Sequence, residues 1–168
     1  MRIQLGGGPG SGKTTLAKRI AVHLNVPYYD MDAIGWESGN GALRPLEVRL
    51  RDVHEIAIQP AWVVDSYFPG WSDELLEAAD HIILLDMPWH IARWRIITRH
   101  MRASLAGTNR HRGLRKLYHF LGHAKECYTS AEERQKDAGY FRPYKSKVIT
   151  CQRPVEVEAA FQQLIERG

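Results

Sequence analysis

The feature that most constrains this chain is a glycine-rich segment near its N-terminus, residues 7–14, which read G-G-P-G-S-G-K-T. The segment fits the pattern G-x-x-x-x-G-K-[ST] without a gap. Residues 3–5, which suit a short strand, precede it, and residues 13–24 follow with apolar side chains at helical spacing. Because a strand, a glycine-rich turn and a helix in this order form a phosphate-binding P-loop, the sequence predicts one here.

The residue types in this loop suit a nucleoside triphosphate bound together with a metal ion. Glycines let several backbone N–H groups point at phosphate oxygens, and the N-terminus of the following helix adds its positive end. Lys13 is expected to reach the β- and γ-phosphates, and the Thr14 hydroxyl to bind Mg²⁺. We therefore expect ATP and Mg²⁺ as ligands, whereas motif and context together disfavour a turn without a ligand. The loop residues expected to hold ATP are Gly8, Pro9, Gly10, Ser11, Gly12, Lys13, Thr14 and Thr15.

Strand-like and helix-like segments alternate along the rest of the chain. This pattern predicts a parallel sheet that is covered on both faces. The expected fold is an α/β P-loop NTPase domain, a three-layer α/β/α sandwich with a five-stranded parallel sheet, and the length of 168 residues suits a single domain over 1–168. The further strands are expected at 26–30, 62–65, 82–86 and 148–151, and the further helices at 46–58, after Ser72, and at 89–102, 114–136 and 155–167.

Composition argues against several other classes of protein. No apolar run approaches the roughly 20 residues of a membrane span, since the longest is residues 82–85. The N-terminus runs into glycines and lacks the apolar core of a signal peptide. Cys127 and Cys151 are by themselves too few for a disulfide framework or a four-ligand zinc site. These features favour a cytoplasmic protein with two reduced thiols and no membrane partner.

Charge is distributed unevenly along the chain. The net charge is +4, yet residues 87–125 contain nine Lys and Arg residues and no Asp or Glu, which leaves −5 for the remainder. Nucleotide phosphates or a nucleic-acid backbone would both suit such a segment. A solvated basic helix face is the third interpretation, although such faces usually mix charges of both signs. Nothing in the sequence indicates the oligomeric state.

Three arginines in this segment are expected to act on the phosphates. Arg95, Arg99 and Arg102 are spaced by four and then three residues, so one helix face presents all of them. Such a row repels itself unless an anion binds, and phosphoryl transfer depends on positioning and charge stabilisation. We expect Arg95 and Arg99 to assist catalysis and Arg99 and Arg102 to bind the nucleotide. Arg110 and Arg112 follow on a loop that could close over the site as a lid.

Carboxylates follow the predicted strands. Asp30 and Asp32 come after the second strand, and an extended backbone there would put both side chains on one face. Asp32 is expected to orient the acceptor hydroxyl, and Asp30 is either a second acceptor contact or a helix cap. Asp65 ends the third strand and is preferred as the Mg²⁺ partner. Asp86 ends the fourth strand and competes for that role, but a helix cap is the simpler interpretation.

Aromatic residues near these strand ends are candidates for an acceptor pocket. The tryptophans near these strand ends are Trp36, Trp62, Trp71 and Trp89, and Tyr67 lies in the aromatic turn after Asp65. Among them, Trp36 and Tyr67 are expected to contact substrate. Core packing is favoured for Trp62 instead.

The P-loop alone does not define the reaction, since kinases, GTPases and motor ATPases share it. The chain is too short for the additional modules of helicases, and it lacks an N-K-x-D guanine motif. These points favour a small kinase. Within it, residues 33–60 are expected to form a helical segment on the acceptor side, and residues 103–117 a lid-like basic loop.

Several of these motifs resemble the adenylate kinases. Residues 7–15 resemble their G-x-P-G-x-G-K-x-T loop, and residues 62–65 with Pro69 are similar to their third strand. L-L-D-M-P at 84–88, with Arg95 and Arg99 after it, is similar to the entry to their lid. The chain most resembles the adenylate-kinase-related group of DNA topology modulation (FlaR-like) proteins, with M-D-A-I-G-W at 31–36 as a further match. The resemblance covers most of 1–102 and implies a nucleoside-monophosphate-kinase-like fold with a short lid, ATP and Mg²⁺ binding, and kinase activity.

The chain also departs from that family. The T-G-D-M-L-R-type segment that binds AMP is absent from residues 33–60, and Gly70 stands where an arginine would follow F-P. The long lid insertion is also missing. The resemblance therefore implies ATP binding, but it does not identify the acceptor.

Three functions follow from these observations. The favoured one is a kinase that transfers the ATP γ-phosphate to a nucleotide or another small molecule. The second is a regulator that uses ATP as a switch and residues 93–116 to contact nucleic acid, a secondary partner. The third is a nucleotide-binding protein without turnover.

Overall fold

The computed structural model describes residues 1–39, 41–107 and 113–166. Five strands form one sheet in the order β2-β3-β1-β4-β5, and every neighbouring pair is parallel. This confirms the expected five-stranded parallel sheet. The strands are β1 (Arg2–Gly7), β2 (Tyr28–Asp30), β3 (Trp62–Asp65), β4 (His81–Leu85) and β5 (Val148–Cys151).

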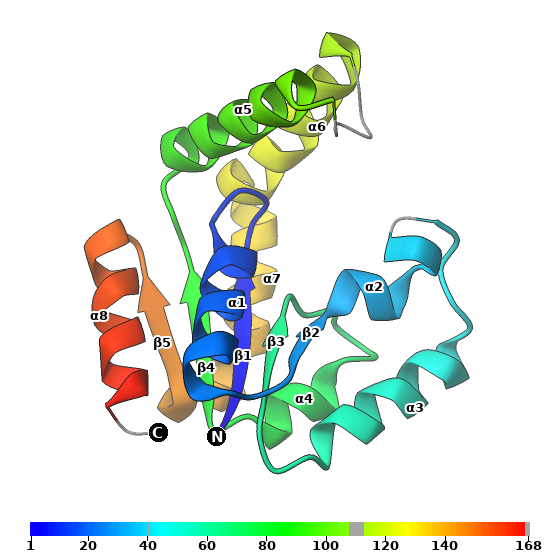
Figure 1. Cartoon of the computed structure of the whole chain (residues 1–168), viewed down its shortest axis with the longest axis vertical. Coiled ribbons are helices and arrows are strands. Elements are labelled where there is room, and N and C mark those ends of the chain that lie inside the picture. Colours follow the sequence, from blue (N-terminus) through cyan, green and yellow to red (C-terminus); the bar gives the residue numbers. More distant parts are fainter. Residues whose placement is uncertain (40, 108–112, 167–168) are drawn as a thin grey trace.

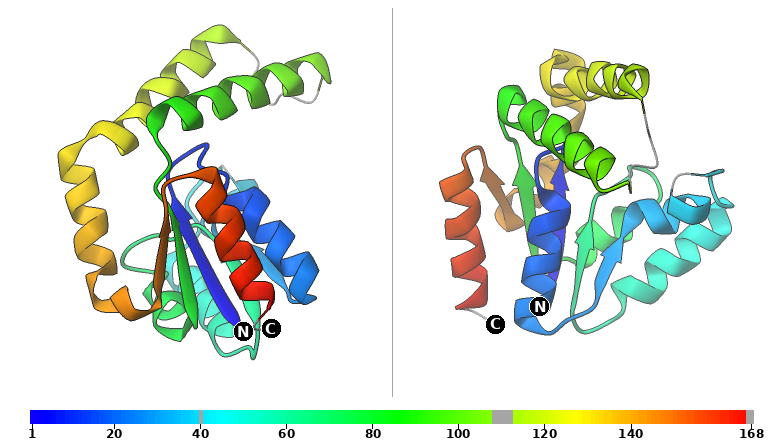
Figure 2. Two further views of the ribbon diagram at one scale, coloured as in Figure 1. Left: turned by 90° about the vertical axis from the view of Figure 1, so that its left-hand side faces the viewer. Right: turned by 45° about the horizontal axis from the view of Figure 1, so that its top comes forward.

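Helices cover both faces of this sheet, as Figures 1 and 2 show. On one face lie α1 (Lys13–Leu24) and α8 (Pro154–Ile165). On the other face lie α3 (Leu46–Ala57), α4 (Asp73–Ala78) and α7 (Ala131–Phe141). The fold is therefore the expected three-layer α/β/α sandwich.

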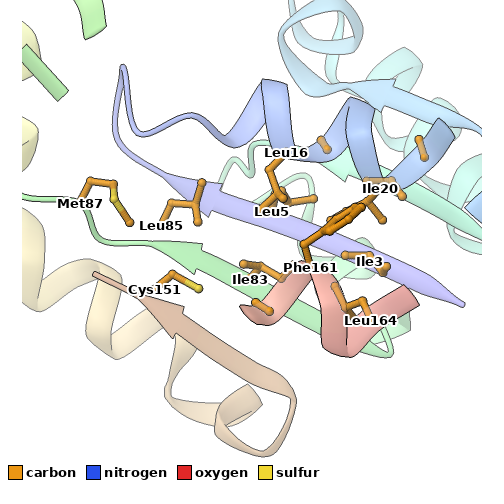
Figure 3. Close-up of a cluster of buried hydrophobic side chains, with 14 residues drawn as sticks. Ile3, Leu5, Leu16, Ile20, Ile83, Leu85, Met87, Cys151, Phe161 and Leu164 are labelled. Carbon is orange, nitrogen blue, oxygen red and sulfur yellow. The ribbon is translucent and has the colours of Figure 1, made fainter. Parts of the chain in front are cut away.

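Two apolar cores fill the space between the layers, because successive strand residues point to opposite faces of the sheet. Figure 3 shows the core beneath α1 and α8, in which Ile3 and Leu5 of β1 lie with Phe161 of α8. Trp62 and Val64 of β3 belong to the core on the opposite face. Trp62 is completely buried, in agreement with the role expected for it.

The central strand carries the glycine-rich loop to the carboxyl ends of the strands. Gly6 and Gly7 of β1 pair with Leu84 and Leu85 of β4. A Cβ at Gly6 would lie 2.7 Å from the Leu84 side chain and 3.0 Å from the Tyr67 ring, so only glycine fits there. The start of the loop is thus set by close packing on both sides of β1.

Two long helices, α5 (Trp89–Leu105) and α6 (Leu114–Thr129), project beyond the carboxyl ends of the strands (Figures 1 and 2). We call this pair the arm. Residues 103–105 and 114–117 are helical, so the lid-like loop expected over 103–117 is shorter than predicted. Gly107 and Gly113, both with positive φ, flank the connection. Arg110 and Arg112 lie outside the described residues.

The single helix expected over 114–136 is wrong. The chain leaves the helical conformation at Ser130, where φ is −71° and ψ is 120°. The Ser130 side chain then accepts a hydrogen bond from the backbone N–H of Glu133 and caps α7, which continues to Phe141. Glu132 and Glu133 stand in the first turn of α7, where acidic side chains are favourable. Helical periodicity continued through this point, and the capping serine was the signal that was overlooked.

The segment expected to be helical over 33–60 consists of three pieces. The short helix α2 (Met31–Gly35) follows β2 directly, and a 3-10 turn, η1 (Glu37–Gly39), precedes α3. A second 3-10 helix, η2 (Arg142–Lys147), leads into β5. Figure 1 shows α2 and α3 together on one side of the molecule, below the arm.

The two cysteines lie on different elements. Cys127 of α6 is partly buried and Cys151 of β5 is buried, and both are free thiols. Within the described ranges, no helix combines the length and the apolar character needed to cross a membrane.

Candidate functional site

A cleft of about 960 Å³ lies between the P-loop and the arm. Its floor is the glycine-rich loop and the first turn of α1, and its roof is formed by side chains of α5 with Phe120 of α6. Asp32 of α2 also borders this cleft. Elements that are far apart in the sequence therefore meet around one space. The lining residues predicted from sequence are Pro9, Gly10, Ser11, Gly12, Lys13, Thr14, Thr15, Asp32, Arg95, Arg99 and Arg102.

The P-loop adopts a conformation that requires its glycines. Gly10 and Gly12 have φ values of 78° and 101°, and Gly12 is the N-cap residue of α1. A Cβ at Gly10 would lie 2.7 Å from the Ala92 carbonyl oxygen. Among residues 1–39, 41–107 and 113–166, no side chain caps the start of α1, and the buried Ser11 hydroxyl has no hydrogen-bond partner. A helix N-terminus with uncapped N–H groups and an unpaired hydroxyl suits an anion such as phosphate.

Asp65 lies at the end of β3 and is 2% exposed. Burial raises the pKa of this carboxyl, while hydrogen bonding from Thr14 and the positive charge of Lys13 act in the opposite direction. Its contacts with the hydroxyls of Tyr28 and Ser66 are both long, at 3.5 Å. A buried carboxylate with weak partners beside a threonine hydroxyl fits the donor set of a divalent cation. Thr14 and Asp65 are therefore the residues that would hold Mg²⁺.

Asp86, the competing carboxylate, lies elsewhere. It accepts hydrogen bonds from Gln152 Nε2 at 3.0 Å and from Arg134 at 3.4 Å. The N-cap residue of α5 is Pro88, and no side chain among the described residues caps that helix. The simpler interpretation of Asp86 as a helix cap is thus wrong, since its carboxylate instead ties β4 to α7 and to the segment after β5.

The three arginines of α5 share one face, and all of them border the cleft. Arg95 donates a hydrogen bond from Nη1 to the Ser11 carbonyl oxygen. The same guanidinium approaches Gly12 so closely that a Cβ there would lie 2.9 Å from Nη1. Arg95 therefore contacts the P-loop backbone directly, and Arg99 and Arg102 lie farther along the cleft.

Sequence reasoning missed Tyr128 of α6, which also holds the P-loop. Its hydroxyl donates to the Pro9 carbonyl oxygen at 3.0 Å, and its ring leaves no room for a side chain at Gly8. The ring also contacts Trp89, with 5.6 Å between centroids, and burial raises the pKa of Tyr128 to about 12. Nothing in the spacing of α6 distinguishes this tyrosine, because the P-loop residues it contacts lie more than a hundred residues away in the sequence.

The backbone is not extended through Asp32, and the interpretation of Asp30 as a helix cap is confirmed. Asp30 is the last residue of β2 and the N-cap residue of α2, where Oδ1 accepts a hydrogen bond from the Asp32 backbone N–H at 2.9 Å. Asp32 is already helical. Burial and the negative charge of Asp30 raise the pKa of the Asp32 carboxyl, and the charge of Lys13 opposes that rise. Of these two carboxylates, only that of Asp32 borders the cleft.

The two aromatic residues expected at the substrate have different positions. Tyr67 stacks on Tyr140 of α7 and donates to Asp137 Oδ1 at 2.7 Å, and it does not line the cleft, so its contact with substrate stays a prediction. The space left at Gly6 admits its ring. Trp36 follows α2 and meets Phe68 edge-on, with 4.8 Å between ring centroids. It stays on the acceptor side.

Comparison with known proteins gives likenesses in fold only. No family model matches the chain, and no curated protein matches it in sequence. A solved gluconokinase from Sinorhizobium meliloti 1021 is 18% identical with a TM-score of 0.50, over 99% of this chain and 94% of that one. An uncharacterized protein from Eubacterium ventriosum ATCC 27560 is 14% identical with a TM-score of 0.54, over 99% and 97%. A shikimate kinase from Bacteroides thetaiotaomicron is 19% identical over 99% and 97%, but its TM-score of 0.49 is too low to support a conclusion.

These likenesses and the observed topology define the class of the fold. It is the α/β fold of small P-loop kinases. At identities of 14% and 18%, the likeness does not extend to a substrate.

Proposed function

We propose that this chain is a small P-loop kinase that transfers the γ-phosphoryl group of ATP to a nucleotide or another small-molecule acceptor. The observation that carries the proposal is the cleft, because one space is bordered by the P-loop, three arginines and Asp32. A kinase needs a phosphate cradle, positive charge and an acid beside the acceptor in this arrangement. The adenylate-kinase-related FlaR-like group remains the family that the sequence motifs favour.

The residues around the P-loop each have a proposed role in binding ATP and Mg²⁺. The backbone N–H groups of the P-loop and Lys13 bind the phosphates, and Arg99 and Arg102 extend the positive surface along the cleft. Arg95 donates to the Ser11 carbonyl oxygen of the loop, and Arg95 and Arg99 stay proposed to assist catalysis. Thr14 and Asp65 hold Mg²⁺, which when bound neutralises charge on the phosphates. Arg110 and Arg112 stay proposed as further phosphate contacts.

Asp32 is the proposed base on the acceptor side. Its raised pKa, still opposed by Lys13, suits a carboxylate that accepts the proton of an acceptor hydroxyl. Asp30 positions it by capping α2. Trp36, packed on Phe68, is proposed to contact the acceptor.

Formation of ADP in the presence of Mg²⁺ and a panel of acceptors tests this proposal. The panel contains nucleoside monophosphates, sugars and hydroxylated acids. We expect ADP to form with one class of acceptor, and to be lost in Lys13→Ala but kept in the control Lys145→Ala, which changes an exposed lysine of η2. ATP binding without acceptor-dependent ADP would instead identify a nucleotide-binding protein without turnover.

A second candidate function rests on the outer surface of the arm. Trp94 and Tyr118 are 67% and 76% exposed, so these rings do not serve the core. They lie in the acid-free segment beside the exposed side chains of Arg93 and Lys116. Exposed aromatic and basic side chains together suit a nucleic-acid backbone and its bases. DNA binding that weakens steeply with salt, and that is lost in Trp94→Ala, would support the regulator.

A further inference from the structure

Gln4 is a polar residue in the middle of the central strand. Its side chain is completely buried, and its neighbours across the sheet are Val64 of β3 and Ile82 of β4. Because Ile3 and Leu5 point to the core beneath α1 and α8, Gln4 points to the apolar core on the opposite face. Its Oε1 is one of three fully buried side-chain atoms without a hydrogen-bond partner among the described residues. A half-satisfied buried amide is costly, and a methionine of similar shape would avoid that cost.

The other half of this amide binds the turn that follows β3. Gln4 Nε2 donates a hydrogen bond to the Ser66 carbonyl oxygen, and the Ser66 backbone N–H donates to the Leu5 carbonyl oxygen at 3.0 Å. Both backbone polar groups of Ser66 are therefore bound to β1. Ser66 has a φ of 74°, in the left-handed region that residues with a Cβ rarely adopt. Such a conformation persists only where its surroundings hold it, and residues strained in this way cluster at functional sites.

The strained residue directly follows Asp65, a proposed ligand of Mg²⁺. The hydroxyls of Tyr28 and Ser66 both lie 3.5 Å from the Asp65 carboxylate, too far for strong hydrogen bonds. Thr14, which also bonds to this carboxylate, is the other proposed ligand. The direction of the carboxylate therefore depends on the backbone, and on the C-terminal side of Asp65 that backbone is bound by Gln4. Groups that orient a metal-binding side chain typically change the affinity for the metal about 10–100-fold.

We propose that Gln4 is a positioning residue of the cation site: by holding Ser66 in its left-handed conformation, it keeps the Asp65 carboxylate beside Thr14. This inference rests on the proposed function, in which Thr14 and Asp65 hold Mg²⁺. Gln4 acts through the backbone of Ser66 and not by contact with the ion or the nucleotide. A purely structural Gln4, which only satisfies the Ser66 carbonyl oxygen, is the competing explanation.

Binding of a non-hydrolysable ATP analogue tests the inference without turnover. The quantity measured is the factor by which excess Mg²⁺ strengthens binding of the analogue relative to binding in EDTA. Gln4→Met keeps the approximate volume of the side chain and loses its amide. In this variant we expect the factor to fall about tenfold, while the dissociation constant in EDTA stays unchanged. An unchanged factor in Gln4→Met would show that the role of Gln4 is purely structural.

Two further variants control for a general loss of stability. Ile82→Val removes a methyl group from the strand residue beside Gln4, so it should lower the melting temperature and leave the Mg²⁺ factor unchanged. Gln4→Asn keeps an amide that is one methylene too short to reach Ser66, and it replaces Gln4→Met in every comparison if that variant does not fold. An equal fall of the Mg²⁺ factor in Ile82→Val and in the Gln4 variant would assign the effect to stability and overturn the inference.

Glycine at position 66 tests the route through the backbone. Because glycine adopts a positive φ without strain, Ser66→Gly should need less support from Gln4. In the Ser66→Gly background, Gln4→Met should lower the Mg²⁺ factor by no more than about threefold. In the Ser66→Ala background, which keeps the strain and loses the hydroxyl, the same change should still lower it about tenfold. Equal losses in the two backgrounds would overturn the inference.

The outcomes separate this inference from the proposed function. An Mg²⁺ factor that requires Gln4, without acceptor-dependent ADP formation, would contradict the kinase and retain the inference. ADP formation together with an equal Mg²⁺ factor in Gln4→Met and in the unchanged protein would retain the kinase and overturn the inference. Binding that Mg²⁺ does not strengthen in the unchanged protein would contradict the proposed cation site, and the inference with it.

Discussion

The P-loop lines the cleft, and the acceptor side reaches it through Asp32, but different kinds of contact determine the structures of these two regions. The P-loop depends on backbone geometry, because Gly10 and Gly12 have positive φ and stand against the arm. The acceptor side depends on side chains, since Arg49, Trp71 and Phe68 stack from elements that are distant in sequence. Backbone constraints recur in many proteins as a motif, whereas stacked side chains are specific to one chain. The comparison explains why the donor can be inferred from sequence and the acceptor requires the structure.

The largest effect is expected at Lys13. Lys13→Ala should lower phosphoryl transfer by at least about 10³-fold, because this charge acts on both the bound nucleotide and the developing transition state. The side chain is only partly buried, so thermal unfolding should change little. Measured ADP formation close to that of the unchanged protein would show that the P-loop is not the donor site.

Asp32 gives the corresponding effect on the acceptor side. Asp32→Asn should lower turnover roughly 10²-fold or more, since the proton of the acceptor hydroxyl would lose its base. The raised pKa of Asp32 implies that turnover falls as pH decreases through a value above that of an ordinary aspartate. A pH–rate profile of Asp32→Asn that still shows this fall would assign it to another group.

Substitution of a glycine should lower the free energy of unfolding by different amounts in the P-loop and in the turn after β3. Gly70 lies in the turn after β3 with φ of 88° and open space around it, so Gly70→Ala should cost about 1–2 kcal/mol from backbone strain. Gly10→Ala carries the same strain and also a contact with the Ala92 carbonyl oxygen, and it should cost about 1–3 kcal/mol more. Urea unfolding of both variants measures the difference, and equal losses would mean that the arm does not pack on the P-loop.

The smallest effect on stability is expected at Asp65. Burial raises its pKa above that of the unfolded chain, so the folded state binds this proton more tightly. The ionised carboxylate therefore destabilises the fold above its folded pKa, and this cost disappears as pH falls below the ordinary aspartate pKa. Asp65→Asn should be neutral or stabilising by up to about 1 kcal/mol at neutral pH, while the dependence of nucleotide binding on Mg²⁺ weakens. A clear loss of stability at neutral pH would contradict this view of Asp65.

Much of the fold could be predicted from the sequence, because strand and helix periodicity are local signals. The five parallel strands and the two covering layers were found in this way. The break at Ser130 was missed, since a helix cap interrupts a pattern that otherwise continues. The helix after Asp30 was left as one of two interpretations, because five residues are too few to show a period.

The candidate site was less accessible from the sequence than the fold. Spacing placed Arg95, Arg99 and Arg102 on one face, and all three border the cleft. Tyr128 and Gln4 could not be found, because their contacts with Pro9 and Ser66 form only after the chain has folded. The packing of Tyr67 against α7 could not be predicted, because an aromatic turn after a strand indicates a ligand contact and a packing contact equally well.

The central claim is that the protein transfers the γ-phosphoryl group of ATP, bound at the P-loop, to an acceptor bound near Asp32 in the same cleft. A single-turnover reaction with Mg²⁺ and ATP radiolabelled in the γ-phosphate, in the presence of the panel of acceptors, tests it most directly. We expect the label in the acceptor for the unchanged protein and for Lys145→Ala, and no transfer in Lys13→Ala. Label that stays in ATP, or that is released only as inorganic phosphate with every acceptor, would contradict the claim.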